Sequence, residues 1–300
     1  MTASMEATMA PEARANELPN SPESYNYDHF HPKYLVKDAK LAAKPKGVVP
    51  GEAAPDFELR DTEGRLWRLS ELRGRPVVLI TGSATCPMTH GSVYGLKEVH
   101  AAFGDRTQWF YLYVREAHPG EHLPSHQAHE QKREQAAFFR QADGVPWPVL
   151  VDDLAGTTAH AYTTLPNAQF VIDAAGVVAF RGDMAHGPTL YRALSDLLAQ
   201  GGVGDIPHAD DSTPHMLATM TYGWDGIERG GETSTHDVWA GAPPMAANLW
   251  LGTQIRPLLA PLASRGKPIS RGVKLAAGAM VLALLLRAGT SRRKSRSRRG

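Results

Sequence analysis

The run PVVLITG at residues 76–82 constrains the fold of this chain more than any other feature. It is a short, continuous apolar segment with β-branched residues, which is typical of a strand buried in a sheet. A helical pattern follows almost at once in CPMTHGSVYGLKEVHAAF, where Pro87 stands at a position that a first helical turn tolerates. Apolar residues recur there at helical spacing, at Val93, Leu96, Val99 and Phe103. A buried strand that leads directly into a helix predicts an α/β fold.

The alternation of strand and helix continues along the chain. The run QWFYLYVRE at 108–116 has a nearly continuous apolar character, as expected of a strand covered on both faces. The other predicted elements are a β-hairpin turning at 61–64, a helix at 126–142, a strand at PWPVLVDD, a short helix after it, a hairpin turning at 174–176 and a helix at 189–200. This order predicts a mixed sheet with helices on both faces.

Composition divides the chain into four parts. Residues 1–50 carry no apolar signal-peptide core and are rich in Ala, Pro and Glu, so we expect a flexible leader and a cytoplasmic location. Residues 51–202 hold the predicted α/β domain. Residues 203–264 are polar and rich in Gly and Pro, which predicts an irregular extension, and 265–300 are expected to form an apolar helix with a basic tail.

The apolar stretch LAAGAMVLALLL near the end of the sequence is shorter than the ~20 residues that span a bilayer. The last ten residues carry six basic groups, while the net charge of the chain is only +1, so the rest of the chain is mildly acidic. We therefore expect no nucleic-acid partner. The sequence leaves open whether the segment 269–300 lies on a membrane surface, and whether the chain forms a homodimer.

Cys86 is the only cysteine in the sequence. A single thiol excludes an intrachain disulfide and a metal site made of cysteines alone, and it suits a reducing compartment. It stands between a predicted buried strand and a predicted helix start, where unpaired backbone amides carry partial positive charge. We therefore predict a lowered thiol pKa and a reactive thiolate here. The alternative is a buried cysteine that only fills space.

Histidines follow the predicted strand at 108–116, at His118, His122, His126 and His129. Three of them lie four residues apart, a spacing that would present a metal-binding face on a helix. Pro119 and Pro124 interrupt any helix there, so we predict no metal site. Six later residues fall in chain predicted to be irregular and receive no predicted role, namely His208, Asp210, Asp211, His215, His236 and Asp237.

Two sets of motifs resemble known families. The run GEAAPDFELRDTEGRLWRLSELRGRPVVLITGSATCP resembles the redoxin branch of the thioredoxin fold, that of the alkyl hydroperoxide reductases and thiol-specific antioxidant proteins. GSATCP, together with YLYVREAHP, WPVLVDD and AYTTLPNAQFVIDAAGVVAFRG, is similar to the iodothyronine deiodinases and their bacterial relatives. The similarity covers about 51–200 and implies a thioredoxin-like α/β domain.

The resemblance to deiodinases implies a role for each matching residue. Cys86 stands where these enzymes have selenocysteine, the nucleophile that takes iodine from an aromatic ring. His118 would donate a hydrogen bond or a proton to the substrate, and Glu116 would orient this chemistry. The implied substrate-binding residues are Ser83, Thr85, His126, Tyr162 and Pro166, the last of which is often preceded by a cis peptide bond in thioredoxin folds.

These observations predict a thiol-dependent oxidoreductase of deiodinase-like type that acts on a halogenated aromatic or a similarly polarised small molecule. Thr89 fills the place that a second cysteine would take in a Cys-x-x-Cys pair. An external thiol, either thioredoxin or a low-molecular-weight thiol, is therefore expected to regenerate Cys86. No bound cofactor is expected.

Two other functions stay open. The first is a one-cysteine peroxidase, although Leu79 and Ser83 replace the proline and threonine of the peroxiredoxin pattern. Arg181 is the nearest candidate for the arginine that would meet the thiolate in such an enzyme. The second is a non-catalytic thioredoxin-fold scaffold in which Cys86 is inert.

Overall fold

The computed structural model describes residues 25–43, 47–163, 165–270 and 272. The chain up to Gly266 falls in one compact unit, and the residues from Lys267 onward fall in another. Within the described part of the chain, no helix is both long and apolar enough to cross a bilayer. Most of the predicted apolar helix and basic tail, and the start of the predicted leader, lie outside the described residues.

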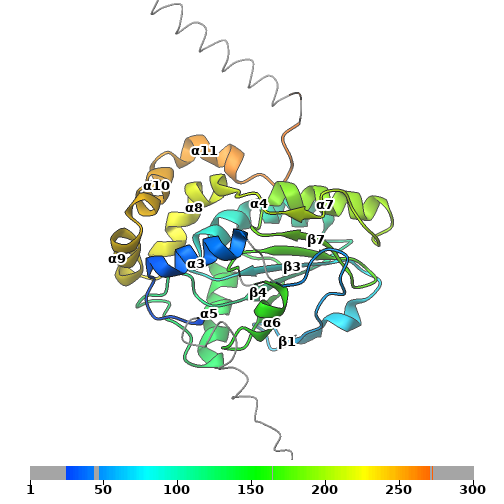
Figure 1. Ribbon diagram of the computed structural model, residues 1–300, viewed down its shortest axis with the longest axis horizontal. Helices are drawn as coiled ribbons and strands as arrows, with labels where there is room; N and C mark the ends of the chain where they lie inside the picture. Colours follow the sequence, from blue (N-terminus) through cyan, green and yellow to red (C-terminus); the bar gives the residue numbers. More distant parts are fainter. Residues whose placement is uncertain (1–24, 44–46, 164, 271, 273–300) are drawn as a thin grey trace, which may run out of the picture. The chain divides into compact units, whose positions relative to one another are not determined.

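The core of the fold is a six-stranded sheet of order β5-β4-β3-β6-β7-β8 (Figure 1). Its strands are β3 (Val77–Gly82), β4 (Gln108–Tyr113), β5 (Val149–Val151), β6 (Gln169–Ile172), β7 (Val178–Gly182) and β8 (Asp210–Asp211). β3, β4 and β5 run parallel, β6 is antiparallel to β3 and β7, and β8 is parallel to β7. The predicted mixed, thioredoxin-like sheet is therefore confirmed, and its last strand lies beyond the predicted domain end at 202.

A separate two-stranded hairpin precedes the sheet. It pairs β1 (Glu58–Arg60) with β2 (Leu66–Arg68), as the sequence predicts, and a 3-10 helix, η1 (Leu69–Leu72), follows it. The turn of this hairpin contains Gly64, whose φ of 83° is a left-handed conformation that glycine adopts without steric penalty.

Both faces of β3 are buried because its alternate side chains enter two different cores. Val78 and Ile80 pack in one core with three helices, namely α4 (Pro87–Phe103), α5 (His129–Ala142) and α7 (Gly187–Ala199). Val77 and Leu79 pack in the other core with α6 (Thr157–Tyr162) and the β1–β2 hairpin. This double burial explains why the run that forms β3 carries no charged residue.

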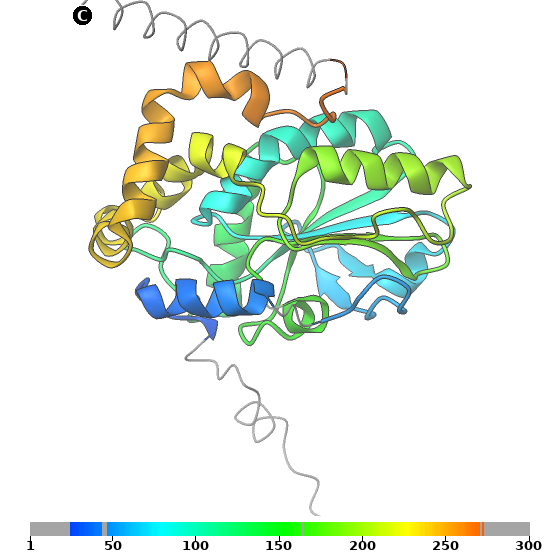
Figure 2. The same cartoon turned by 45° about the horizontal axis from the view of Figure 1, so that its top comes forward.

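The prediction of an irregular extension at 203–264 is wrong. This part of the chain forms α8 (Met216–Glu228), α9 (Glu232–Gly241), α10 (Pro243–Gln254) and α11 (Arg256–Ala263). Figure 2 shows α8 beside α4, with the yellow-to-orange helices α9 to α11 beyond it. The glycines that made this segment read as irregular allow close packing, since a Cβ on Gly223 would lie 2.8 Å from Cβ of Pro87.

The prediction of a flexible leader is also wrong for the described residues 25–43. The side chains of Tyr25, Tyr27 and Phe30 are buried, and a helix, α3 (Pro32–Ala43), follows them. Phe30 joins a third apolar cluster with residues of the C-terminal helices, among them Trp224 and Ile227. Three aromatic side chains in a short segment give enough apolar surface to hold it against the domain.

The close approach of α8 to α4 gives a test of this packing. Gly223→Ala should destabilise the protein by about 1–3 kcal/mol, because the added methyl group overlaps Pro87. In a helix without such a neighbour, Gly→Ala is instead stabilising by about 1 kcal/mol. The measurement is urea denaturation, with Asn248→Ala at an exposed position of α10 as the control. A Gly223→Ala protein as stable as the control would contradict this packing.

Candidate functional site

Cys86 lies where the sequence predicts, between a buried strand and a helix start. It is the N-cap residue of α4, and Pro87 is the first residue of the helix. Its carbonyl oxygen accepts a hydrogen bond from the amide of His90 at 3.0 Å. The Cys86 side chain is fully buried, with an exposed fraction of 0%. The site is therefore closed to solvent at the sulfur.

The predicted lowering of the Cys86 pKa is wrong, since burial raises the pKa of this thiol above its ordinary value. The Thr89 side chain, the amides of Thr89 and Met88 at the start of α4, and the charge of Arg115 all act in the opposite direction. Their combined effect is smaller than the desolvation of the thiolate. The helix start thus favours the anion, but the closed environment favours the neutral thiol.

Glu116 is the centre of a buried hydrogen-bond network beside Cys86. Its Oε2 accepts hydrogen bonds from the amide of Thr85 at 2.9 Å and from the Thr85 hydroxyl at 2.6 Å. Its Oε1 accepts one from the hydroxyl of Tyr113 and lies 3.6 Å from Nε2 of His126. Burial alone would raise the pKa of Glu116, but His126, Thr85 and Tyr113 outweigh burial and hold it below the ordinary value. The carboxylate is therefore ionised.

His118 is held by the residue that precedes Cys86. Its amide donates to the Thr85 hydroxyl at 3.0 Å, and its carbonyl oxygen accepts from the hydroxyl of Ser234 in α9 at 2.6 Å. Its buried Nδ1 has no hydrogen-bond partner among the described residues. Burial, reinforced by the charge of Arg115, lowers the pKa of His118 to about 3. The imidazole is therefore neutral at physiological pH.

His126 joins the same network through its side chain and its backbone. Its Nε2 lies 2.9 Å from Oε1 of Gln135 in α5. Its amide donates to Oδ1 of Asn26 at 3.1 Å, so the ordered N-terminal segment fixes the loop that carries it. The structure thus brings together four of the predicted site residues, namely Thr85, Glu116, His118 and His126.

Other predicted site residues have different surroundings. Tyr162 packs in the second core, on the other face of the sheet, and its hydroxyl donates to the carbonyl of Pro55 at 2.6 Å. The Ser83 hydroxyl is buried without a hydrogen-bond partner among the described residues. No peptide bond in the described chain is cis, so the cis bond expected at Pro166 is not found. The Arg181 guanidinium pairs with Asp183 at 3.1 Å and also donates to the carbonyl of Val48.

Two segments that the sequence analysis left without a function cover the site. The ring of Phe30 lies 4.5 Å from that of His118, centroid to centroid. From the other side, α8 approaches so closely that a Cβ on Gly226 would lie 3.3 Å from the carbonyl oxygen of Cys86. Just after α8, a Cβ added to Gly230 would lie only 2.7 Å from the carbonyl oxygen of His118. The sequence features that could have predicted this cover are the aromatic residues of the leader and the closely spaced glycines of the extension.

A second group of titratable side chains lies apart from these residues. His186, Asp211 and His215 place their ligand atoms within 4.8 Å of one another. The sequence analysis assigned no role to Asp211 or His215 and did not consider His186. The motif DDSTPH, which holds an aspartate and a histidine four residues apart, was the available signal.

Part of the chain matches the model of a known family. Residues 50–181 match the model of the AhpC/TSA family. Over 165 residues, the chain is 28% identical to Thyroxine 5-deiodinase of Gallus gallus, a match that covers 51% of this chain and 62% of that protein. The chain therefore spans less than two thirds of the length of this relative.

Solved structures of similar fold align with about half of the chain. A putative Thiol:disulfide interchange protein DsbE from Chlorobium tepidum aligns with a TM-score of 0.39 and 18% identity, covering 51% of this chain and 98% of that chain. Peroxidoxin BcpB from Mycobacterium tuberculosis aligns with a TM-score of 0.36 and 22% identity, covering 51% and 95%. The AhpC/TSA match over residues 50–181 confirms the predicted resemblance to the redoxin branch, and the order of the sheet confirms the predicted mixed α/β fold.

Proposed function

We propose that this protein is a thiol-dependent oxidoreductase of deiodinase-like type, in which Cys86 is the nucleophile. One observation carries the proposal: Thr85, directly before Cys86, joins the thiol loop to Glu116 and to His118 through three hydrogen bonds. The deiodinase-like relative supports the substrate class, a halogenated aromatic molecule.

In the proposed reaction, the Cys86 thiolate attacks the halogen of an aromatic carbon–halogen bond. A sulfur–halogen bond forms as the carbon–halogen bond breaks, and the ring carbon takes up a proton. One external thiol then displaces halide from sulfur and forms a mixed disulfide. A second thiol releases Cys86 as a free thiol and leaves with the first as a disulfide. Two thiols are oxidised and the aromatic ring loses its halide.

We assign different roles to His118 and Glu116, the two neighbours of the thiol loop. Because the pKa of His118 is about 3, its ring is uncharged and donates a hydrogen bond from N–H to a substrate oxygen. Glu116 is ionised and accepts from Thr85 and Tyr113, so it acts as a positioning residue for the loop. The reaction begins from an exposed sulfur, so part of the cover over the site must open before substrate enters.

A one-cysteine peroxidase is the second candidate, and the AhpC/TSA match favours it. In that reaction Cys86 attacks a peroxide oxygen, the oxygen–oxygen bond breaks, and the sulfur becomes a sulfenic acid that two thiols reduce. Arg181 pairs with Asp183 and so does not fill the predicted role beside the thiolate. Arg115, whose charge favours the Cys86 anion, is instead our candidate for the arginine of a peroxidase site.

The first prediction tests whether Cys86 dehalogenates. Full-length protein with an excess of dithiothreitol and an iodinated phenol should release iodide, and Cys86→Ser should release none above the background without protein. The measurement is free iodide, with hydrogen peroxide consumption followed in parallel. Iodide release that is equal in both proteins contradicts the deiodinase-like function. If peroxide consumption depends on Cys86 and no iodide is released, the one-cysteine peroxidase is the function and the deiodinase-like proposal is rejected.

The second prediction concerns access to the sulfur. Since the chain has one cysteine, alkylation by iodoacetamide reports Cys86 alone. Because burial raises the pKa, alkylation should be slow and should rise only at pH values above the ordinary thiol range. Phe30→Ala should increase the rate several-fold by removing the ring that covers His118.

Leu258→Ala, at a side chain 78% exposed on α11, is the matched control and should leave the rate unchanged. The closed site is refuted if the wild-type protein is alkylated as fast as a free cysteine peptide across the whole pH range. An unreactive Cys86 in both the wild-type and Phe30→Ala proteins points to the inert scaffold.

The third prediction concerns the buried carboxylate. Glu116→Gln should lower the free energy of unfolding at pH 7 by about 1–3 kcal/mol, because an amide cannot accept all the hydrogen bonds from Thr85 and Tyr113. The folded-state pKa of Glu116 is below its ordinary value of 4.5. Its contribution is therefore complete above that value and is lost as pH falls through the lower folded pKa.

The difference in stability between the wild-type and Glu116→Gln proteins, measured by urea denaturation, should accordingly shrink on acidification. Glu134→Gln, at an exposed position of α5, is the control and should show no such difference. A difference that stays constant from neutral to strongly acidic pH would show that the Glu116 charge does not stabilise the fold.

A further inference from the structure

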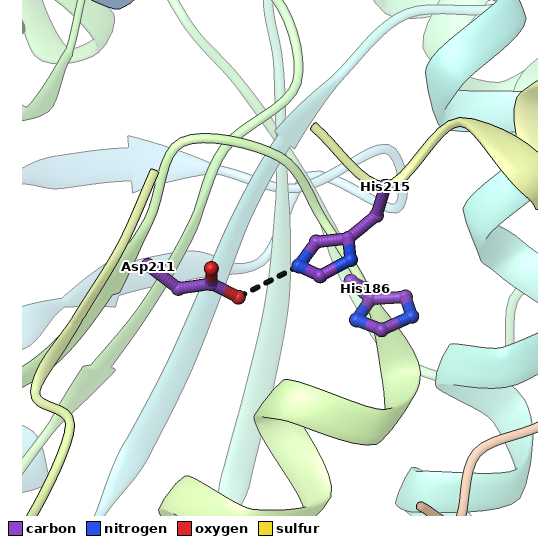
Figure 3. A group of neighbouring side chains, drawn as sticks. All are labelled: His186, Asp211 and His215. Carbon is purple, nitrogen blue, oxygen red and sulfur yellow. Dashed lines mark hydrogen bonds and ion pairs between the residues drawn. The ribbon is translucent and has the colours of Figure 1, made fainter. Parts of the chain in front are cut away.

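Two histidines and one aspartate, residue types that commonly bind metal ions, meet at one edge of the sheet, as Figure 3 shows. His186 is the N-cap residue of α7, Asp211 belongs to β8, and His215 is the N-cap residue of α8. Nε2 of His215 lies 2.8 Å from Oδ2 of Asp211. The rings of His186 and His215 stack with their centroids 3.6 Å apart and their planes 10° from parallel. Three different elements thus bring the cluster together.

Hydrogen bonds fix the backbone of His186 and of Asp211. The amide of His186 donates to Oε1 of Gln169 at 3.1 Å, and the Thr189 hydroxyl donates to its carbonyl oxygen. The carbonyl oxygen of Asp211 accepts from the amide of Asp183 at 3.0 Å, within the pairing of β8 with β7. The backbone positions of these two residues are therefore set before any ion arrives, which lowers the entropic cost of binding.

One nitrogen in the cluster lacks a partner. Nδ1 of His186 is buried and makes no hydrogen bond to any described residue. A neutral imidazole has a free lone pair, and a buried polar atom without a partner is destabilising. A bound cation would supply the missing partner to this ring.

The donor set matches a divalent transition metal. Two imidazole nitrogens and one carboxylate oxygen are a set that Zn²⁺ accepts with water at a fourth position. Ligand atoms at 2.0–2.1 Å from a tetrahedral Zn²⁺ stand roughly 3.3 Å apart. That separation lies between the 2.8 Å of the His215–Asp211 contact and the 4.8 Å limit of the cluster.

We propose that His186, Asp211 and His215 form a binding site for a divalent transition metal ion of the zinc type. On binding, the ion replaces the proton shared between Nε2 of His215 and Oδ2 of Asp211. The His186 ring turns out of its stack about the Cβ–Cγ bond, a broad torsion that changes at little cost. Thr213 keeps its hydrogen bond to Oδ1 of Asp211, which leaves Oδ2 for the ion.

A metal ion at this site would connect two parts of the fold. His186 belongs to the loop between β7 and α7, whereas Asp211 and His215 belong to the segment that leads into α8. An ion bound by all three connects the start of the C-terminal helices to the sheet. It stabilises the folded state by mass action, since the three ligands are not held together in the unfolded chain. This inference does not depend on the chemistry of Cys86.

The test uses the full-length protein, stripped of metal with a chelator and then dialysed. Zn²⁺ should bind at one equivalent by isothermal titration calorimetry and should raise the melting temperature. Co²⁺ should give the visible absorption of a tetrahedral site with nitrogen and oxygen ligands. His186→Ala and His215→Ala should each weaken Zn²⁺ binding by at least about tenfold, the loss seen even for an outer-shell partner.

Asp211→Asn keeps a polar side chain beside His215 and so tests the charge of the site if an alanine variant is too unstable to purify. His236→Ala, an exposed histidine next to Asp237, is the matched control and should bind Zn²⁺ as the wild type does. Cys86→Ser should also bind normally. The proposal is overturned by no binding, by binding that survives in His186→Ala and His215→Ala, or by a Co²⁺ spectrum that shows a thiolate ligand.

Discussion

The arrangement of the site depends on one buried carboxylate. Glu116 is 1% exposed, so its charge must be compensated by nearby donors or it would be too costly to bury. Thr85 supplies two of those donors and Tyr113 a third. Because Thr85 follows β3 and Glu116 follows β4, satisfying this charge holds together the ends of two parallel strands. Cys86 directly follows Thr85, and the amide of His118 donates to the Thr85 hydroxyl, so both residues are placed by the same interaction.

Burial, which makes Glu116 a strong constraint on the fold, also determines the protonation state of the Cys86 thiol. A helix start stabilises an anion by about 0.3–1 kcal/mol when exposed, whereas full burial shifts a pKa by up to several units. At Cys86 desolvation is the larger effect, so the sulfur is protonated in the closed structure. Glu116 stays ionised because it has three kinds of donor around it, while the sulfur has only the start of α4 and Thr89. Access to solvent therefore controls whether this cysteine is a nucleophile.

The sequence predicts the central strands because double burial leaves an unmistakable apolar run in β3 and β4. The resemblance to deiodinases implies that Thr85, Glu116 and His118 share one site, and the structure brings them together at the ends of two neighbouring parallel strands. The sequence does not predict α8 to α11, because glycines such as Gly223 lower helix propensity locally and are explained only by the contact with Pro87. His186 and His215 are separated along the chain and meet only once β8 pairs with β7. The sign of the Cys86 pKa shift depends on the complete burial of the thiol, to which no local sequence pattern points.

The thiol and the proposed metal site share one structural element, α8. Its first residue follows His215, and Gly223 and Gly226 press against Pro87 and Cys86. A metal ion at His215 would hold the start of this helix to the sheet without touching the sulfur. Opening of the thiol site then has to occur in the other parts of the cover, at Phe30 and at the contact of α9 with His118 through Ser234. These contacts come from chain segments outside the sheet, so they can separate while the α/β core stays folded.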